Sequence, residues 1–176
     1  EIALAVSEHY LPLGLDGKTP KKHFSIALAL TDKIDTLVGF FGINQKPTSS
    51  KDPYALRRLA LGVVKLLIDN NKEFKIKDLI NYSASLHRDQ GFELSNDLFQ
   101  KELAEFLMDR LKYYMKEKKI RSDISEAAIK SCGINHMNKI YKKAHTLNKL
   151  IVEEIGEDII ASYKRASSIL ESELKN

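Results

Sequence analysis

The stretch HFSIALALTDKIDTLVGFFG, residues 23–42, decides the fold. Its apolar residues recur every third or fourth position, the spacing that gathers side chains on one face of an α-helix. This stripe consists of Ile26, Leu30, Ile34, Leu37, Val38 and Phe41. Phe24 and Leu28 lie on the opposite side and form a second apolar face. The stretch therefore predicts a helix that packs on two sides.

The helical period continues along the rest of the chain, and no run alternates with the period of two that is typical of strands. Further helices are expected near residues 1–10, 53–69, 75–90, 95–118, 123–132, 136–155 and 157–174. Gly91, Gly133 and Gly156 fall at the breaks, as is common after helix ends. Asp52 is expected as the N-cap of the helix that starts at Pro53. The sequence predicts an all-α protein.

The composition limits the possible partners. Hydrophobic residues make up 43% and charged residues 30% of the 176 residues, values typical of a globular domain. No apolar run approaches the roughly 18 residues that span a bilayer, so no membrane partner is expected. The net charge of +4 comes from 28 Lys and Arg residues against 24 Asp and Glu residues. Only six of the 28 cations are Arg. This mild excess permits an anionic partner without requiring one.

Several chemical motifs are absent from the sequence. There is no phosphate-binding glycine loop, paired-cysteine zinc pattern or His-Glu-x-x-His sequence. The five histidines are scattered, none precedes an Asp, and the single cysteine, Cys132, cannot form a disulfide within the chain. No metal site and no catalytic site are expected from these residues.

Asp32 and Asp35 lie beside the second apolar face of the helix at residues 23–42. A carboxylate in such a place needs a cation or hydrogen-bond donors. We expect an ion pair with Lys33, Arg57 or Arg58 that fixes helix packing. A vestigial metal position is the alternative interpretation, although one helix supplying two acids falls short of a site.

The loop before Asp52 combines hydroxyls and lysines, among them Lys51, with free backbone N–H groups at a helix start. Such a loop can hold a phosphate. The carboxylate of Asp52 occupies some of these donors, which favours a rigid capped loop. Arg57 and Arg58 project about 100° apart, so one is expected to pair with Asp32 or Asp35 while the other can reach solvent or a nucleic-acid phosphate.

Four lysines share one side of the helix expected at residues 136–155: Lys139, Lys142, Lys143 and Lys149. More cations precede this helix, namely Lys112, Lys116, Lys118, Lys119 and Arg121. Together they are the best local candidate for a surface that contacts an RNA backbone. A solvated face of an amphipathic helix explains the same pattern, so the residues alone leave both interpretations open.

Four segments, in order, resemble the β subunit of bacterial heterotetrameric glycyl-tRNA synthetase. They are EHYLP (8–12), ALTDKIDTLVGFF (29–41), KPTSSKDPYALRR (46–58) and ASYKRASSIL (161–170). Ser49 stands where many relatives are expected to have Gly. The resemblance implies a part of a longer subunit. It implies the latter part of an HD-like helical bundle in residues 1–118, followed by a helical extension, residues 119–176, that leads toward an anticodon-binding domain absent from this sequence.

The resemblance also implies a function. It indicates a helical piece of the cytoplasmic α₂β₂ glycine–tRNA ligase that contributes to tRNA binding and subunit architecture and carries no catalytic site of its own. The implied partners are tRNA(Gly) and the α subunit, which uses the ATP and Mg²⁺ of the aminoacylation reaction; no cofactor is implied for this piece. Two alternatives stay open: an assembly module without tRNA contact, and an HD-type metal phosphohydrolase.

Overall fold

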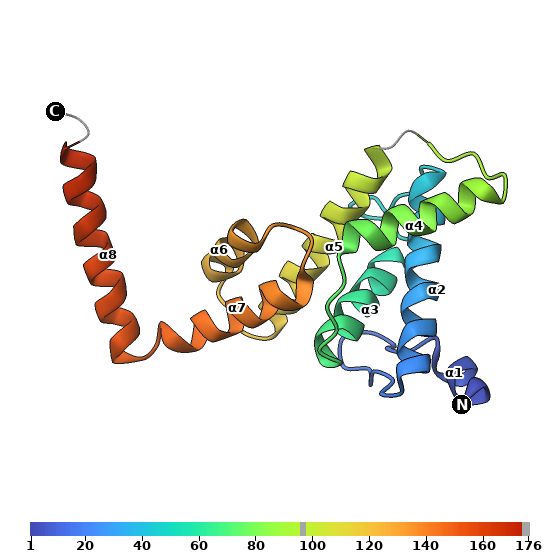
Figure 1. Cartoon of the computed structure of the whole chain (residues 1–176), viewed down its shortest axis with the longest axis horizontal. Helices are drawn as coiled ribbons and strands as arrows, with labels where there is room; N and C mark the ends of the chain where they lie inside the picture. The colour runs from blue at the N-terminus through green and yellow to red at the C-terminus, as the bar shows by residue number, and fades with distance from the viewer. Residues whose placement is uncertain (96–97, 174–176) are drawn as a thin grey trace.

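The computed structural model describes residues 1–95 and 98–173, and within them it contains eight helices and no strand (Figure 1). The helices are α1 (Ile2–Glu8), α2 (His23–Gly42), α3 (Leu56–Asp69), α4 (Ile76–Asp89), α5 (Leu98–Glu117), α6 (Ser122–Cys132), α7 (Met137–Leu150) and α8 (Glu154–Glu173). The all-α prediction is confirmed. The HD-like character and the division near residue 118 stay predictions.

Helix α5 is the centre of the packing, because it contacts α2, α3, α4, α6 and α7. Leu103, Leu107 and Leu111 on its inner face are fully buried. The stripe expected on α2 is also buried, with Leu37 and Val38 at 0% exposure. Each such side chain contributes roughly 1.5–3 kcal/mol of hydrophobic stabilisation. In contrast, α8 projects away from the other helices (Figure 1).

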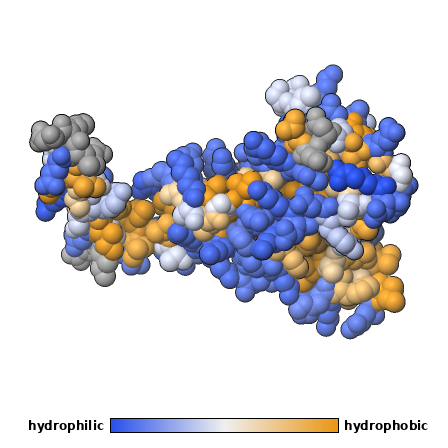
Figure 2. All heavy atoms as spheres, turned by 45° about the horizontal axis from the view of Figure 1, so that its top comes forward, coloured by the Kyte–Doolittle hydropathy of each residue, from blue (hydrophilic) through white to orange (hydrophobic). Residues whose placement is uncertain are grey.

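The second apolar face of α2 is only partly covered. Phe24 is 53% exposed and Leu28 is half-buried. Leu4 of α1 lines the same hollow as Phe24. Other apolar residues of α1 and of the segment after it are also exposed, and we call the whole set the N-terminal apolar patch: Ile2, Leu4, Val6, Tyr10, Leu13 and Phe24. Hydrophobic residues gather at this end of the molecule in Figure 2. In the described part of the chain, no helix is long and apolar enough to cross a membrane.

Helix α3 begins at Leu56 and not at Pro53, which corrects the expected start. Ala55 adopts the left-handed conformation, with φ of 54°, so the helix cannot extend back through it. Asp52 nevertheless caps the helix, because its carboxylate oxygens accept hydrogen bonds from the backbone N–H groups of Leu56 (2.8 Å) and Arg57 (3.0 Å). The carboxylate reaches these N–H groups across an intervening turn.

The break between the last two helices also differs from the expectation. Helix α7 ends at Leu150, and α8 already begins at Glu154, so Gly156 lies within the first turn of α8. A Cβ atom at Gly156 would come within 2.0 Å of the carbonyl oxygen of Leu150. Position 156 therefore requires glycine because the ends of α7 and α8 approach too closely for a side chain. It does not serve as a C-cap.

Lys33 is buried in the core, with 2% exposure, which periodicity did not indicate. Its Nζ donates a hydrogen bond to the carbonyl oxygen of His9 at 2.8 Å and so ties α2 to the end of α1. A Cβ atom at Gly62 of α3 would come within 2.8 Å of Lys33 Cε, so the glycine leaves room for the lysine stem. Burial lowers the pKa of Lys33, although the Asp32 charge raises it in part.

A buried tyrosine joins α5 to α3. The Tyr114 hydroxyl donates to Asp69 Oδ1 at 3.0 Å, and Lys65 Nζ lies 3.3 Å from Asp69 Oδ2. Burial and the Asp69 carboxylate raise the pKa of Tyr114 well above its ordinary value. The folded protein therefore holds the phenolic proton more tightly than the unfolded chain does.

We predict that Tyr114→Phe lowers the free energy of unfolding at neutral pH by about 1.5–3 kcal/mol, because it removes a hydrogen bond to a charged group. The stabilisation from the tyrosine proton is complete below the ordinary tyrosine pKa of 10.0 and is lost as the pH rises above it. Denaturant unfolding between pH 7 and 11 should show a smaller alkaline loss for the variant than for the parent. The exposed Tyr82→Phe is the control, and an unchanged alkaline loss in Tyr114→Phe contradicts the prediction.

Candidate nucleic-acid interface

The lysines expected to contact RNA share one surface of α7. Lys139, Lys142, Lys143 and Lys149 are all exposed, and we call them the α7 lysine face. The opposite side of α7 carries the buried Met137, Ile140 and Ala144. Among the residues that the structure describes, no carboxylate pairs with any of the four lysines. The positive charge of this face is therefore not neutralised by the carboxylates that the structure describes.

Polar contacts hold α7 at its N-terminal end. Glu73 accepts a hydrogen bond from the backbone N–H of Lys139 (3.1 Å), and its other oxygen lies 3.0 Å from His136 Nδ1. The side-chain amide of Asn138 donates to Asn71 at 2.9 Å. These contacts satisfy helix N–H groups and fix the helix to the segment before α4. The lysine face is thus presented by a helix with a defined orientation.

The loop before α3 is held together by its own polar groups. Lys51 N–H donates to Thr48 Oγ1 at 3.1 Å, and the Arg57 guanidinium donates to the Thr48 carbonyl oxygen. Arg57 also lies 3.8 Å from Asp52. These contacts agree with the rigid capped loop. One arginine of the pair meets an acid, but this acid is Asp52 and not the expected Asp32 or Asp35. The side chains of Lys51 and Arg58 are exposed.

Asp35 does not pair with Lys33, Arg57 or Arg58, so this expectation was wrong. Its Oδ1 lies 3.0 Å from His87 Nε2 and accepts a hydrogen bond from Ser83 Oγ at 3.1 Å. Both partners belong to α4, which crosses α2 beside the second apolar face. The helical wheel placed the acid correctly, but it could not show which distant helix faces it.

Asp32 acts on Lys33 only through its charge, because Lys33 Nζ is bonded to the His9 carbonyl oxygen instead. Asp32 and Asp35 share no further ligand: across residues 1–95 and 98–173, no group of three or more His, Cys, Asp or Glu side chains is placed to hold a metal ion. Asp35 and His87 contribute only two donors, and these contact each other. Asp32, Asp35 and His87 by themselves therefore do not make up a metal centre.

The structure adds a cationic site that sequence reasoning missed. Arg57 and Arg58 of α3 face Arg110 of α5 across a cavity of about 290 Å³, which Tyr113 also lines. We call this cavity the arginine groove; its remaining lining residues are Gly14, Leu15 and Leu61. The sequence shows that Arg110 and Tyr113 are spaced to share one helix face. It does not show that they lie opposite Arg57 and Arg58, because that depends on how the helices pack.

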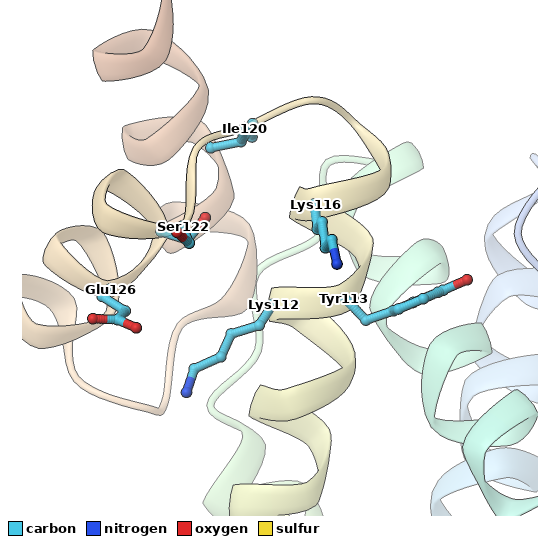
Figure 3. Close-up of a pocket in the computed structure, with 7 residues that line it drawn as sticks. Lys112, Tyr113, Lys116, Ile120, Ser122 and Glu126 are labelled. Carbon is cyan, nitrogen blue, oxygen red and sulfur yellow. The ribbon is translucent and has the colours of Figure 1, made fainter.

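A second cavity, of about 420 Å³, lies between α5 and α6 and shares Tyr113 with the arginine groove. Lys112 and Lys116 border it, and Glu126 stands on the α6 side (Figure 3). The other lining residues are Ile120, Ser122 and Ser125. We call it the α5–α6 pocket. Lysines, a carboxylate and an aromatic ring around one hollow can bind a ligand that is polar, flat and partly anionic.

The fold and these surfaces define an all-α module with exposed cations on α3, α5 and α7. The sequence model of the family described as glycyl-tRNA synthetase beta subunit matches residues 1–130. The chain belongs to this family, which confirms the resemblance drawn from the four segments.

Individual relatives agree. Proteins called glycine–tRNA ligase beta subunit are 38% identical in Cereibacter sphaeroides over 170 residues and 37% identical in Rhodospirillum centenum over 176 residues. These alignments cover 96% and 99% of this chain but 24% of each relative. The protein of the same name from Rickettsia canadensis is 38% identical over 170 residues, again with 24% of its length covered. The chain thus spans about a quarter of the length of these relatives.

We predict that Asp52→Ala lowers the free energy of unfolding by about 1–2 kcal/mol, because the first N–H groups of α3 lose their acceptor. Chemical denaturation followed by circular dichroism measures the loss. Asp109→Ala is the matched control, because Asp109 is exposed and pairs only at 3.9 Å with Lys112, so a change within about 0.5 kcal/mol is expected. Equal losses in both variants would contradict the capping role of Asp52.

Proposed function

We propose that this chain is a helical part of the β subunit of glycine–tRNA ligase that binds tRNA(Gly) through the α7 lysine face. The observation that carries the proposal is the group of four exposed lysines without carboxylate partners among the described residues. Because the chain belongs to a family of tRNA ligase subunits, RNA is the polyanion that we expect these lysines to bind. Lys51, Arg57 and Arg58 are further candidates for tRNA contact.

Lysines on a fixed helix suit contacts to the phosphate backbone. Each Lys that neutralises a phosphate releases condensed counterions, so the binding free energy comes from charge and depends on salt. Lysine supplies a point charge and no planar fork, which favours contacts that position the RNA over contacts that read its bases. In this proposal the chain grips tRNA(Gly) without reading its sequence through α7.

The chemistry of the ligase is assigned to the partner subunit. Aminoacylation with ATP and Mg²⁺ takes place on the α subunit in this proposal, and the present chain contributes tRNA binding to the assembled cytoplasmic enzyme. Asp32 and Asp35 serve packing, because Asp35 is engaged by His87 and Ser83. No step of the reaction is assigned to a residue of this chain.

We predict that replacing Lys139, Lys142 and Lys143 together by Glu weakens tRNA(Gly) binding on the order of tenfold or more at low salt, because three favourable charges become repulsive. The slope of the logarithm of the association constant against the logarithm of the salt concentration should become shallower by about two to three. Fluorescence anisotropy with labelled tRNA over a salt series measures both quantities.

The matched control replaces three exposed lysines elsewhere by Glu, namely Lys22, Lys77 and Lys101. It makes the same change in net charge, so it separates the long-range field of the protein from contact at α7. The control should retain most of the affinity. Equal losses in the two variants would mean that α7 is not the tRNA surface, and undetectable tRNA binding by the parent chain would refute the proposed function.

Assembly with the α subunit is a second candidate function, and the N-terminal apolar patch favours it. Ile2, Leu13 and Tyr10 are 71%, 70% and 68% exposed, respectively. Contiguous exposed apolar residues of this kind commonly mark a protein–protein contact. In this proposal the patch is covered by the α subunit of the ligase.

We predict that Leu4→Ser combined with Val6→Ser weakens binding to the α subunit, because two exposed apolar side chains leave the contact while the core is untouched. Copurification and sedimentation with purified α subunit measure the effect. Ile159→Ser on α8 is the control, since Ile159 is similarly exposed at 55% but belongs to another surface. An unchanged complex with the double variant would assign the patch to some other contact.

A further inference from the structure

We propose that the arginine groove and the α5–α6 pocket form one site for a single-stranded stretch of RNA. The arginines hold a phosphate, Tyr113 stacks on a base, and the α5–α6 pocket receives a base that carries an exocyclic amino group. The proposal rests on the proposed function in so far as RNA is the ligand. It differs in placing a base-contacting site on α3, α5 and α6, away from the α7 lysine face.

The charge in the arginine groove exceeds what the protein neutralises. Half of the six arginines in the sequence line this one cavity. Asp52 compensates Arg57, whereas no carboxylate of the described residues pairs with Arg58 or Arg110. Arg58 is also exposed. Guanidinium groups bind phosphate oxygens in pairs of parallel hydrogen bonds, so a groove with two uncompensated arginines matches a phosphate.

Arg110 is held in place by aromatic rings and not by an acid. The centre of its guanidinium lies 5.7 Å from the Phe106 ring and 5.8 Å from the Tyr113 ring. These distances are those of cation–π contacts, which order the side chain while leaving its charge available. An ordered cation loses less entropy when it binds an anion. The groove is therefore prepared for an anionic group before the RNA arrives.

Tyr113 connects the two cavities. It lines both of them and is 41% exposed. In Figure 3, Lys112 points from α5 toward Glu126 of α6, whereas Tyr113 points to the other side, toward α3. An exposed ring beside cations is the arrangement by which proteins hold unstacked bases of single strands. A nucleotide chain can thus pass from the arginines over Tyr113 to the pocket.

The α5–α6 pocket fits a base better than a phosphate. Its carboxylate, Glu126, repels a phosphate but accepts hydrogen bonds from an amino group on a base edge. The buried Ile120 gives the pocket an apolar surface, and Lys112 and Lys116 at the rim can meet the flanking phosphates. Cytosine offers an exocyclic amino group, whereas uracil has a carbonyl oxygen at the same position. The pocket should therefore prefer cytosine over uracil.

An acidic peptide is the other polyanion that the arginines could attract. It would place carboxylates beside Glu126, which repels them, and it would offer no flat ring to Tyr113. RNA satisfies the arginines, the aromatic ring and the carboxylate together, so RNA is the ligand that these residues favour.

The test measures binding of fluorescently labelled hexacytidylate and hexauridylate to the full 176-residue chain by anisotropy. The parent should bind hexacytidylate about threefold to tenfold more tightly, the effect of one ordinary hydrogen bond to the exposed Glu126. Arg58→Ala should weaken both oligonucleotides by about fivefold to tenfold and reduce the salt slope by about 0.7. Glu126→Ala should abolish the preference for cytidine and leave hexauridylate binding unchanged or tighter.

Lys101→Ala provides the matched control, because it removes an exposed cation from α5 at a position that lines neither cavity. Its affinities should equal those of the parent. Thermal unfolding of each variant, followed by circular dichroism, reports whether the fold is retained; Arg58 and Glu126 are exposed, so little change is expected.

The results separate this inference from the proposed function. If the parent binds tRNA(Gly) through α7 but Arg58→Ala binds both hexamers as tightly as the parent, the groove is refuted and the proposed function stands. If both hexamers bind equally to the parent, the assignment of the base pocket is refuted. If hexaglutamate binds in an Arg58-dependent manner and neither hexamer binds, the groove is a protein contact and the RNA proposal is overturned.

Discussion

The hydrogen bond from Tyr114 to Asp69 fastens the buried inner face of α5 to the end of α3. Tyr114 is 2% exposed, and the same carboxylate pairs with the buried Lys65. A rotation of α5 about its axis would leave the buried Tyr114 hydroxyl without its acceptor, which costs about 1–3 kcal/mol. Since α5 contacts five of the other helices, its orientation affects how most of the helices pack.

The inward orientation of Tyr114 also decides which residues of α5 face outward. Successive residues of a helix point about 100° apart, so the inward position of Tyr114 turns its neighbour Tyr113 toward the outside. Arg110 lies one turn before Tyr114 and beside Tyr113, where the two aromatic rings of Phe106 and Tyr113 hold its guanidinium. The arginine groove and the α5–α6 pocket are thus positioned by an interaction that neither cavity contains.

The sequence predicted what depends on local periodicity. The buried stripe of α2 and the α7 lysine face were found because each is a property of one helix. The contact of Asp35 with His87, and that of Arg110 with the groove, join helices far apart in the chain, and no single period encodes which helices cross. The start of α3 was misplaced for a local reason: Asp-Pro commonly opens a helix, but Ala55 adopts a left-handed turn first.

The distribution of the acids matters more than the net charge of +4. Asp69 is used to fix α5, Asp52 to cap α3, and Glu73 to cap α7. Each of these carboxylates accepts a hydrogen bond in a structural contact, and none of them pairs with a side chain of the α7 lysine face or with the exposed Arg58. At an ionic strength near 0.15 M, charges are screened beyond about 8 Å, and a polyanion responds to the local excess of cations, not to the sum over the chain. A nearly neutral composition is therefore compatible with locally cationic surfaces, because Asp69, Asp52 and Glu73 are held in structural contacts and, among the described residues, no carboxylate pairs with the α7 lysines or Arg58.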